Sequence, residues 1–221
     1  MTAPTLDTQE TIGKIVDSGV VAVLRGAGAD TVVDTAEALA EGGVTAIELT
    51  ADTPGVMDML DDVTDALAGS DVVVGVGTVL DEATARSAIL AGAEFVVQPT
   101  FSEEVVRVCN RYGVPVAPGV FTPTEAIDAY EAGADFVKVF PAKTGGPEHV
   151  SAIKGPLGQV PIMPTGGVDL DNAADFIDAG AVCVGAGSAL VDDEAVQAGD
   201  FEAVTERARE FSQVVADARD E

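Results

Sequence analysis

The sequence has no tryptophan, one histidine and two cysteines in 221 residues. Cys109 and Cys183 stand alone in apolar surroundings, without the spacing of a disulfide framework or a zinc site, so we expect both to be buried packing residues. His149 has no neighbouring cysteine or carboxylate to complete a ligand set. Long apolar runs and a signal peptide are also missing. These absences predict no metal, no membrane contact and a cytoplasmic location.

Basic residues are scarce as well, with 11 lysines and arginines against 38 acidic residues, which leaves a formal net charge of −27. A surface this negative repels polyanions, so nucleic acid is not an expected partner. Such an imbalance is tolerated where concentrated salt shortens the Debye length to about 3 Å. We therefore predict a halophilic protein from a high-salt cytoplasm, with an ordinary acidic protein as the alternative.

The sequence is rich in short β-branched runs that alternate with longer amphipathic runs. Hydrophobic residues make up 47% of the chain, enough for one continuous core. Eight runs predict strands, at Val20–Arg25, Ala46–Thr50, Val72–Thr78, Glu94–Pro99, Val114–Gly119, Phe136–Pro141, Pro161–Gly166 and Ala181–Gly187. The segments between them predict helices, including Asp30–Glu41, Asp81–Leu90, Ser102–Arg111, Pro123–Glu131 and Asp171–Asp178.

Glycines separate several of these helices from the next strand, where a left-handed residue is needed to end the helix. They are Gly43, Gly92, Gly113, Gly133 and Gly180. Eight strand–helix units predict an α/β fold, a single (β/α)₈ TIM barrel over residues 1–221, with an N-terminal helix at about 7–18 and a C-terminal helix at about 198–218. An open doubly wound sheet is the alternative.

Two charged residues lie inside apolar predicted strands, Lys138 in Phe136–Phe140 and Glu48 in Ala46–Thr50. Strand alternation puts Glu48 on the face opposite its apolar neighbours, so it would project into the barrel. A buried amine favours its neutral form, which is the nucleophile that attacks a ketone to form an imine. The pair predicts a catalytic amine with a base beside it, and a structural ion pair is the alternative.

Glycine clusters follow the last two predicted strands, at Thr165-Gly166-Gly167 and at Gly185-Ala186-Gly187-Ser188. Backbone without Cβ atoms can bring several N–H groups onto one anion. Barrels commonly bind phosphate in these two loops. The clusters therefore predict a phosphate site.

Several segments together resemble the bacterial KDPG/KHG (2-keto-3-deoxy-6-phosphogluconate / 4-hydroxy-2-oxoglutarate) aldolase family. They are Ala22–Arg25, Ile47–Thr50, Val76–Leu80, Phe136–Pro141, Pro164–Gly167 and Gly187–Val191. The resemblance implies a class I (Schiff-base) aldolase that cleaves 2-keto-3-deoxy-6-phosphogluconate to pyruvate and glyceraldehyde 3-phosphate in Entner–Doudoroff sugar catabolism. It implies no metal and no cofactor, a phosphorylated sugar-acid substrate, and a homotrimer.

The resemblance also implies roles for individual residues. Lys138 matches the family's Schiff-base lysine and Glu48 its general base. The residues that match substrate contacts are Arg25, Thr78, Phe140, Thr165, Gly166, Gly167, Gly187 and Ser188.

One position departs from the pattern of some members, which carry a carboxylate-binding arginine where this chain has Asp52. Members with the Thr53-Pro54 form of this loop also lack that arginine. We therefore expect Arg25, Thr78 and backbone donors to bind the pyruvate carboxylate.

Three rival functions stay open on the sequence. A galactonate-directed aldolase would share the mechanism but prefer the other C4 epimer. A phosphosugar isomerase or epimerase would use the same phosphate loops with acid–base pairs and no imine. A non-catalytic phosphosugar-binding protein would hold Glu48 and Lys138 as a static ion pair.

The net charge of −27 predicts that folding and activity improve as KCl screens the repulsion between acidic residues, most steeply at low ionic strength. Thermal unfolding and turnover measured from dilute buffer to molar KCl test this. Equal stability at both ends of the series would contradict the halophilic interpretation.

Overall fold

The computed structural model describes residues 7–220. The predicted domain 1–221 also includes residues 1–6 and 221, which lie outside the described range. Every predicted strand run contains strand residues, at β1 (Val20–Leu24), β2 (Ala46–Thr50), β3 (Val73–Gly77), β4 (Phe95–Val97), β5 (Val116–Ala117), β6 (Gly119–Val120), β7 (Val137–Val139), β8 (Ile162–Pro164) and β9 (Val184–Ala186). The fifth run is divided between β5 and β6 at Pro118, which has no N–H to donate.

The helices of the described residues are α1 (Thr8–Ser18), which precedes β1, and α2 (Val32–Glu41), α3 (Val56–Ala66), α4 (Glu82–Leu90), α5 (Glu103–Tyr112), α6 (Pro123–Glu131), α7 (Ala142–Lys154), α8 (Ala173–Asp178), α9 (Asp193–Ala198) and α10 (Phe201–Asp220). Local sequence explains several boundaries. Thr122 and Glu125 form a capping box at the start of α6, with proline in its first turn. The five glycines predicted to be left-handed all have positive φ, which confirms that prediction.

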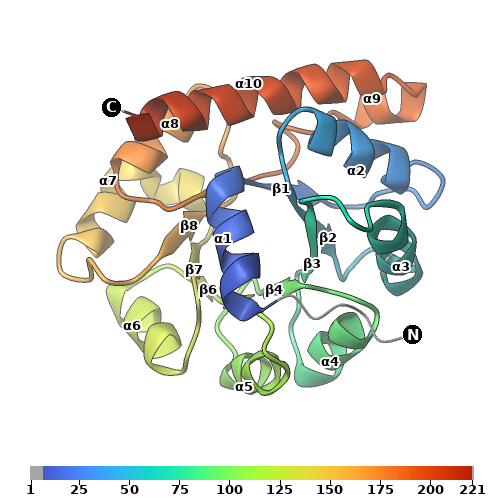
Figure 1. Ribbon diagram of the computed structural model, residues 1–221. Helices are drawn as coiled ribbons and strands as arrows, with labels where there is room; N and C mark the ends of the chain where they lie inside the picture. The colour runs from blue at the N-terminus through green and yellow to red at the C-terminus, as the bar shows by residue number, and fades with distance from the viewer. Residues whose placement is uncertain (1–6, 221) are drawn as a thin grey trace.

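All paired strands run parallel. One sheet has the order β5-β4-β3-β2-β1-β9 and a second has the order β6-β7-β8. A single parallel bridge between Thr165 and Gly185 links the end of β8 to β9. The predicted α/β fold with parallel strands is thereby confirmed. Figure 1 shows the helices after β1 placed around the outside of the strands, with α10 running past α2 and α8.

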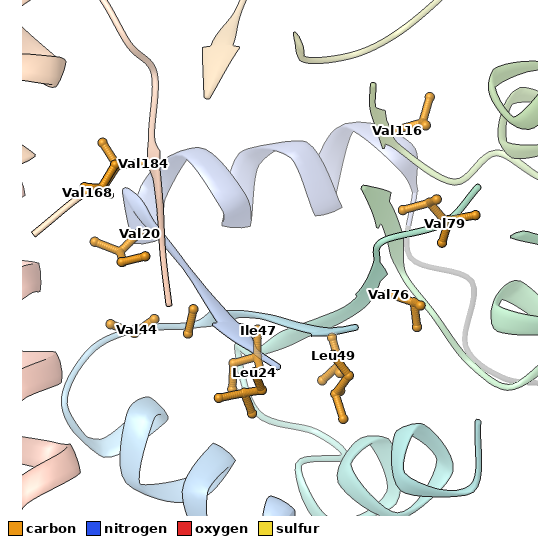
Figure 2. Packing of buried hydrophobic residues seen from close by; sticks show 14 of the residues in the cluster. Val20, Leu24, Val44, Ile47, Leu49, Val76, Val79, Val116, Val168 and Val184 are labelled. Carbon is orange, nitrogen blue, oxygen red and sulfur yellow. The ribbon is translucent and has the colours of Figure 1, made fainter. Parts of the chain in front are cut away.

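Alternate residues of the strands belong to two separate apolar clusters. The outer cluster lies between strands and helices, and includes Val20, Leu24, Ile47, Leu49 and Val76 (Figure 2). The inner cluster comes from the other strand face and from α1, and contains Ile15, Val21, Ala46, Val73, Phe95, Val97, Ala117, Phe136, Met163 and Cys183. Helix α1 lies across the middle of the strands in Figure 1 and contacts β1, β2 and β3, so it covers this apolar interior at one end.

The interior changes from apolar to polar along each of three strands. Two residues after an inner apolar residue, on the same strand face, come Glu48, Lys138 and Thr165, all buried. The half of the interior at the amino ends of the strands is therefore filled by apolar side chains. The half at their carboxyl ends holds the ionisable groups. This division positions the site.

The two cysteines are buried and free, as predicted from their apolar surroundings. Burial raises the pKa of each thiol to about 12, so neither is a ready thiolate nucleophile. Across residues 7–220, every helix is too short or too polar to cross a membrane.

Candidate active site

A cavity of about 910 Å³ opens at the carboxyl ends of β1, β7, β8 and β9. This volume falls in the usual range of small-molecule sites, about 300–1,000 Å³. Eight of the ten predicted site residues line it, namely Arg25, Lys138, Phe140, Thr165, Gly166, Gly167, Gly187 and Ser188. The remaining two, Glu48 and Thr78, are not part of this lining.

Lys138 is the only buried lysine of residues 7–220, with 5% of its surface exposed. Parallel pairing places it beside Gly119 of β6 and Met163 of β8. Its Nζ lies 5.2 Å from the centroid of the Phe140 ring, a cation–π distance. Within the described residues Lys138 takes part in no salt bridge within 4.0 Å. The amine is therefore held at the cavity wall without a direct ionic partner.

Glu48 is 1% exposed, and its Oε1 has no hydrogen-bond partner among the described residues. Gly77 on the neighbouring strand makes room for the carboxyl, because a Cβ there would overlap Glu48 Oε1. Burial raises the pKa of Glu48 above its ordinary value of 4.5, against the lowering effect of the Lys138 and Arg25 charges. A buried acid with a raised pKa near a cavity amine is a candidate proton shuttle.

Arg25 follows β1 and connects the cavity to Thr78. Its Nη2 donates to Thr78 Oγ1 at 3.1 Å, and its Nη1 pairs with Asp52 Oδ2 at 2.8 Å. Thr78 has a φ of 58°, the only non-glycine residue with positive φ in residues 7–220. Such backbone is uncommon and clusters at functional sites. The structure thus brings both predicted carboxylate ligands together.

Phe140 separates the amine from the glycine loops. Gly166, with φ 90°, lies against its ring, and a Cβ there would approach the ring to 2.9 Å. A Cβ on Gly167 would overlap the aliphatic part of Lys143. Glycine is required at both positions, and the exposed backbone faces the cavity where the predicted phosphate would bind.

Thr165 lies in the polar half of the interior, directly before the Gly166-Gly167 loop. A Cβ on Gly185 would overlap its side chain, so the glycine of β9 makes space for the threonine. Thr165 Oγ1 is buried and has no hydrogen-bond partner within residues 7–220. A buried hydroxyl without a partner is costly unless a ligand supplies one.

Some site residues were not found from the sequence. The loop from Gly26 to Thr31 also lines the cavity, as do Asp169 and Asp193. The sequence marked Asp52 only as the position that lacks the family's arginine, and in the structure it is the ion-pair partner of Arg25. For Glu48, which the sequence did identify, the alternation Gly75-x-Gly77 on the neighbouring strand was a further readable signal. Small residues on one strand face leave space for a large inward side chain.

His149 lies away from the cavity lining, stacked on Phe121 at 4.6 Å with its Nε2 donating to the Phe121 carbonyl. In the part of the chain that the structure describes, no three His, Cys, Asp or Glu side chains are grouped to hold a metal ion.

A parallel α/β fold with a buried lysine at the wall of a cavity, and a buried carboxyl in the same interior, is an arrangement suited to forming imines with carbonyl substrates. The chain belongs to the KDPG and KHG aldolase family, whose sequence profile matches residues 12–207. The resemblance inferred from the motifs is thereby confirmed.

Individual relatives agree. The chain is 38% identical to 2-dehydro-3-deoxy-phosphogluconate aldolase of Treponema pallidum over 83% of this chain and 87% of the relative. It is 34% identical to 2-dehydro-3-deoxy-6-phosphogalactonate aldolase of Escherichia coli over 77% and 83%. A Legionella pneumophila KDPG aldolase, solved with pyruvate as a covalent carbinolamine intermediate, superposes with a TM-score of 0.83 at 28% identity, covering 89% of this chain and 95% of that one.

Replacing Glu48 by glutamine is expected to stabilise the fold at neutral pH. Because burial raises the pKa of Glu48, the stability associated with its protonated form is complete below the unfolded pKa of about 4.5 and is lost as pH rises through the folded pKa. Glutamine imitates the protonated form at every pH. The difference in Tm between Glu48→Gln and wild type, measured in one concentration of KCl, should be near zero at pH 4 and positive at pH 7.

The exposed Glu103→Gln serves as the matched control, because its carboxylate lies on the surface of α5. Its Tm difference should stay small at both pH values. A Glu48→Gln variant that is less stable than wild type at pH 7 would contradict the raised pKa.

Proposed function

We propose that this protein is a class I aldolase that cleaves 2-keto-3-deoxy-6-phosphogluconate to pyruvate and glyceraldehyde 3-phosphate through a Schiff base on Lys138. The observation that carries the proposal is the placement of a buried amine at the cavity wall with an unpartnered carboxyl in the same interior. The family and the covalent carbinolamine in the Legionella relative support it.

In this mechanism the neutral Lys138 amine attacks the C2 ketone, and loss of water from the carbinolamine leaves a protonated imine. A base takes the proton of the C4 hydroxyl, the C3–C4 bond breaks, and the electron pair moves into the iminium to give an enamine. Protonation at C3 and hydrolysis then release pyruvate and restore the amine. Glu48 moves the protons, since its carboxyl is held without a competing hydrogen bond at Oε1.

Substrate contacts follow from the order of residues along the cavity. Arg25 and Thr78 lie together and would bind the carboxylate of the pyruvate half. Phe140 forms the wall beside the imine, and Thr165 faces the C4 region. Gly166, Gly167, Gly187 and Ser188 would bind the phosphate through backbone N–H groups and a hydroxyl.

The second candidate is the galactonate-derived epimer of the substrate. The 34% identical Escherichia coli relative is named for that substrate, and the mechanism would be the same. We favour the gluconate compound because the family resemblance puts Thr165 at the C4 hydroxyl, and its buried Oγ1, without a partner among the described residues, is available to that hydroxyl. A phosphosugar isomerase or epimerase and a non-catalytic binding protein account less well for the buried Lys138.

We also propose the architecture, oligomeric state and location of the enzyme. The two sheets would complete one closed (β/α)₈ barrel over residues 1–221, which the Thr165–Gly185 bridge and the division of one strand at Pro118 support. A homotrimer in a salt-rich cytoplasm follows from the family resemblance and the net charge of −27. A molar-mass measurement in molar KCl would test the trimer.

Reduction with borohydride in the presence of pyruvate should inactivate the protein and leave a stable mass increment on Lys138, because the imine is reduced to a secondary amine. Peptide mass spectrometry locates the label. Lys143 and Lys154 are internal controls, and Lys138→Ala should remain unlabelled. An isomerase, an epimerase or a binding protein would give no adduct, so an unlabelled wild type would refute the aldolase assignment.

Wild type should cleave the gluconate-derived phosphate faster than the galactonate epimer by roughly 5- to 150-fold, the effect of one unpaired buried polar group. Thr165→Val should bring the ratio of the two kcat/KM values close to one, whereas Thr165→Ser, which keeps the hydroxyl, should retain much of it. Faster cleavage of the galactonate epimer by wild type would reverse the substrate assignment and leave the aldolase mechanism in place.

A further inference from the structure

The loops after β1 and β2 are joined at two consecutive residues. Arg25 Nη1 pairs with Asp52 Oδ2 at 2.8 Å, and the Gly26 N–H donates to Thr53 Oγ1 at 3.1 Å. Thr53 is itself 3.3 Å from the Thr50 hydroxyl, and both are buried. The loop that carries Asp52 is therefore fixed to the end of β2 and to the residue that follows Arg25.

A third loop joins through the other end of the guanidinium, where Arg25 Nη2 donates to Thr78 Oγ1 at 3.1 Å. Thr78 adopts left-handed backbone, which persists only where surrounding contacts determine it. Asp52 and Thr78 thus hold the two Nη atoms from opposite sides. The plane of the guanidinium is set by residues of two different loops.

The guanidinium keeps free donors after these contacts. Arginine has five N–H donors in a planar fork that matches a carboxylate, and the two contacts use one on each Nη atom. Arg25 lines the cavity together with Lys138, whereas Asp52 does not line it. The free donors are accordingly available to a ligand at the imine end of the cavity.

The ion pair contributes little to stability by itself. The Arg25 and Asp52 side chains are 62% and 45% exposed. Exposed ion pairs stabilise a fold only weakly, and concentrated salt screens their attraction further. Its effect is geometric, because without Asp52 the long arginine side chain would sample many rotamers. Asp52 stands where some family members carry the arginine that binds the substrate carboxylate. Its effect on Arg25 explains how an aspartate can occupy that position.

We propose that Asp52 is a positioning residue, which orients Arg25 so that the free guanidinium N–H groups bind the carboxylate of the 2-keto acid. The proposal rests on the proposed function, since it requires a keto acid at Lys138. Asp52 makes no contact with the substrate. Removing its charge therefore weakens carboxylate binding, and it affects the imine chemistry only through its effect on the pKa of Glu48, which is smaller than those of burial, Lys138 and Arg25.

The experiment follows imine formation at Lys138 with cyanoborohydride, which reduces the iminium and spares free ketone. Wild type, Asp52→Asn and Glu103→Gln are compared at one KCl concentration. Glu103 is the matched control, since it is a comparably exposed carboxylate paired with Arg107 on α5, outside the cavity, and its replacement changes the net charge equally. Pyruvate is the carboxylate probe, and acetone is the ketone without a carboxylate.

For Asp52→Asn, the pyruvate concentration that gives half-maximal trapping should rise roughly tenfold, as expected when a charge-assisted contact loses its orientation. The maximal trapping rate and the rate with acetone should match wild type, and Glu103→Gln should match it throughout. An unchanged or lowered half-saturation for pyruvate would overturn the proposal. So would an equal change with pyruvate and acetone, which indicates general damage to the site. Absence of trapping in wild type would instead refute the proposed function.

Discussion

The burial of two ionisable groups, Lys138 and Glu48, in one strand-lined interior is the constraint on which the rest of the structure depends. Ionised groups are expensive away from water unless they are compensated. The interior accommodates them by keeping its amino-terminal half apolar and covered by α1. Gly77 leaves room for the Glu48 carboxyl, and Lys138 and Arg25 oppose the rise in its pKa.

The scarcity of basic residues bears on the part of the cavity proposed to bind phosphate. In a chain with 38 acidic residues, Arg25 and Lys138 are the basic residues of the lining, and Asp30, Asp169 and Asp193 line it too. Lys143 packs against Gly167 but is not part of the lining, so a phosphate at the glycine loops would depend mainly on neutral donors, the backbone N–H groups and hydroxyls. Such donors keep their strength in concentrated salt better than exposed charges, whose attraction is screened.

The order of elements was readable from the sequence because local rules determine it. Alternation along its strand predicted that Glu48 faces inward, an amine within an apolar strand marked Lys138, and helix-ending glycines predicted the left-handed positions. Helices α3 and α7 were less evident. In α7 a non-helical Gly146 with φ 66° and ψ −172° precedes Pro147 and interrupts the apolar period. The division of one strand at Pro118 also depends on pairing, since its carbonyl accepts the Lys138 amide.

By itself the sequence determined which residues are candidates for the chemistry, because residue type and strand parity are properties of the chain. Only the tertiary structure decided how they act together. The pairing of Arg25 with Asp52 joins residues 27 apart, and its contact with Thr78 spans 53. The space that Gly77 leaves for Glu48 likewise exists only when two strands lie side by side. Contacts between separate loops depend on the packing of the whole fold, which local patterns do not encode.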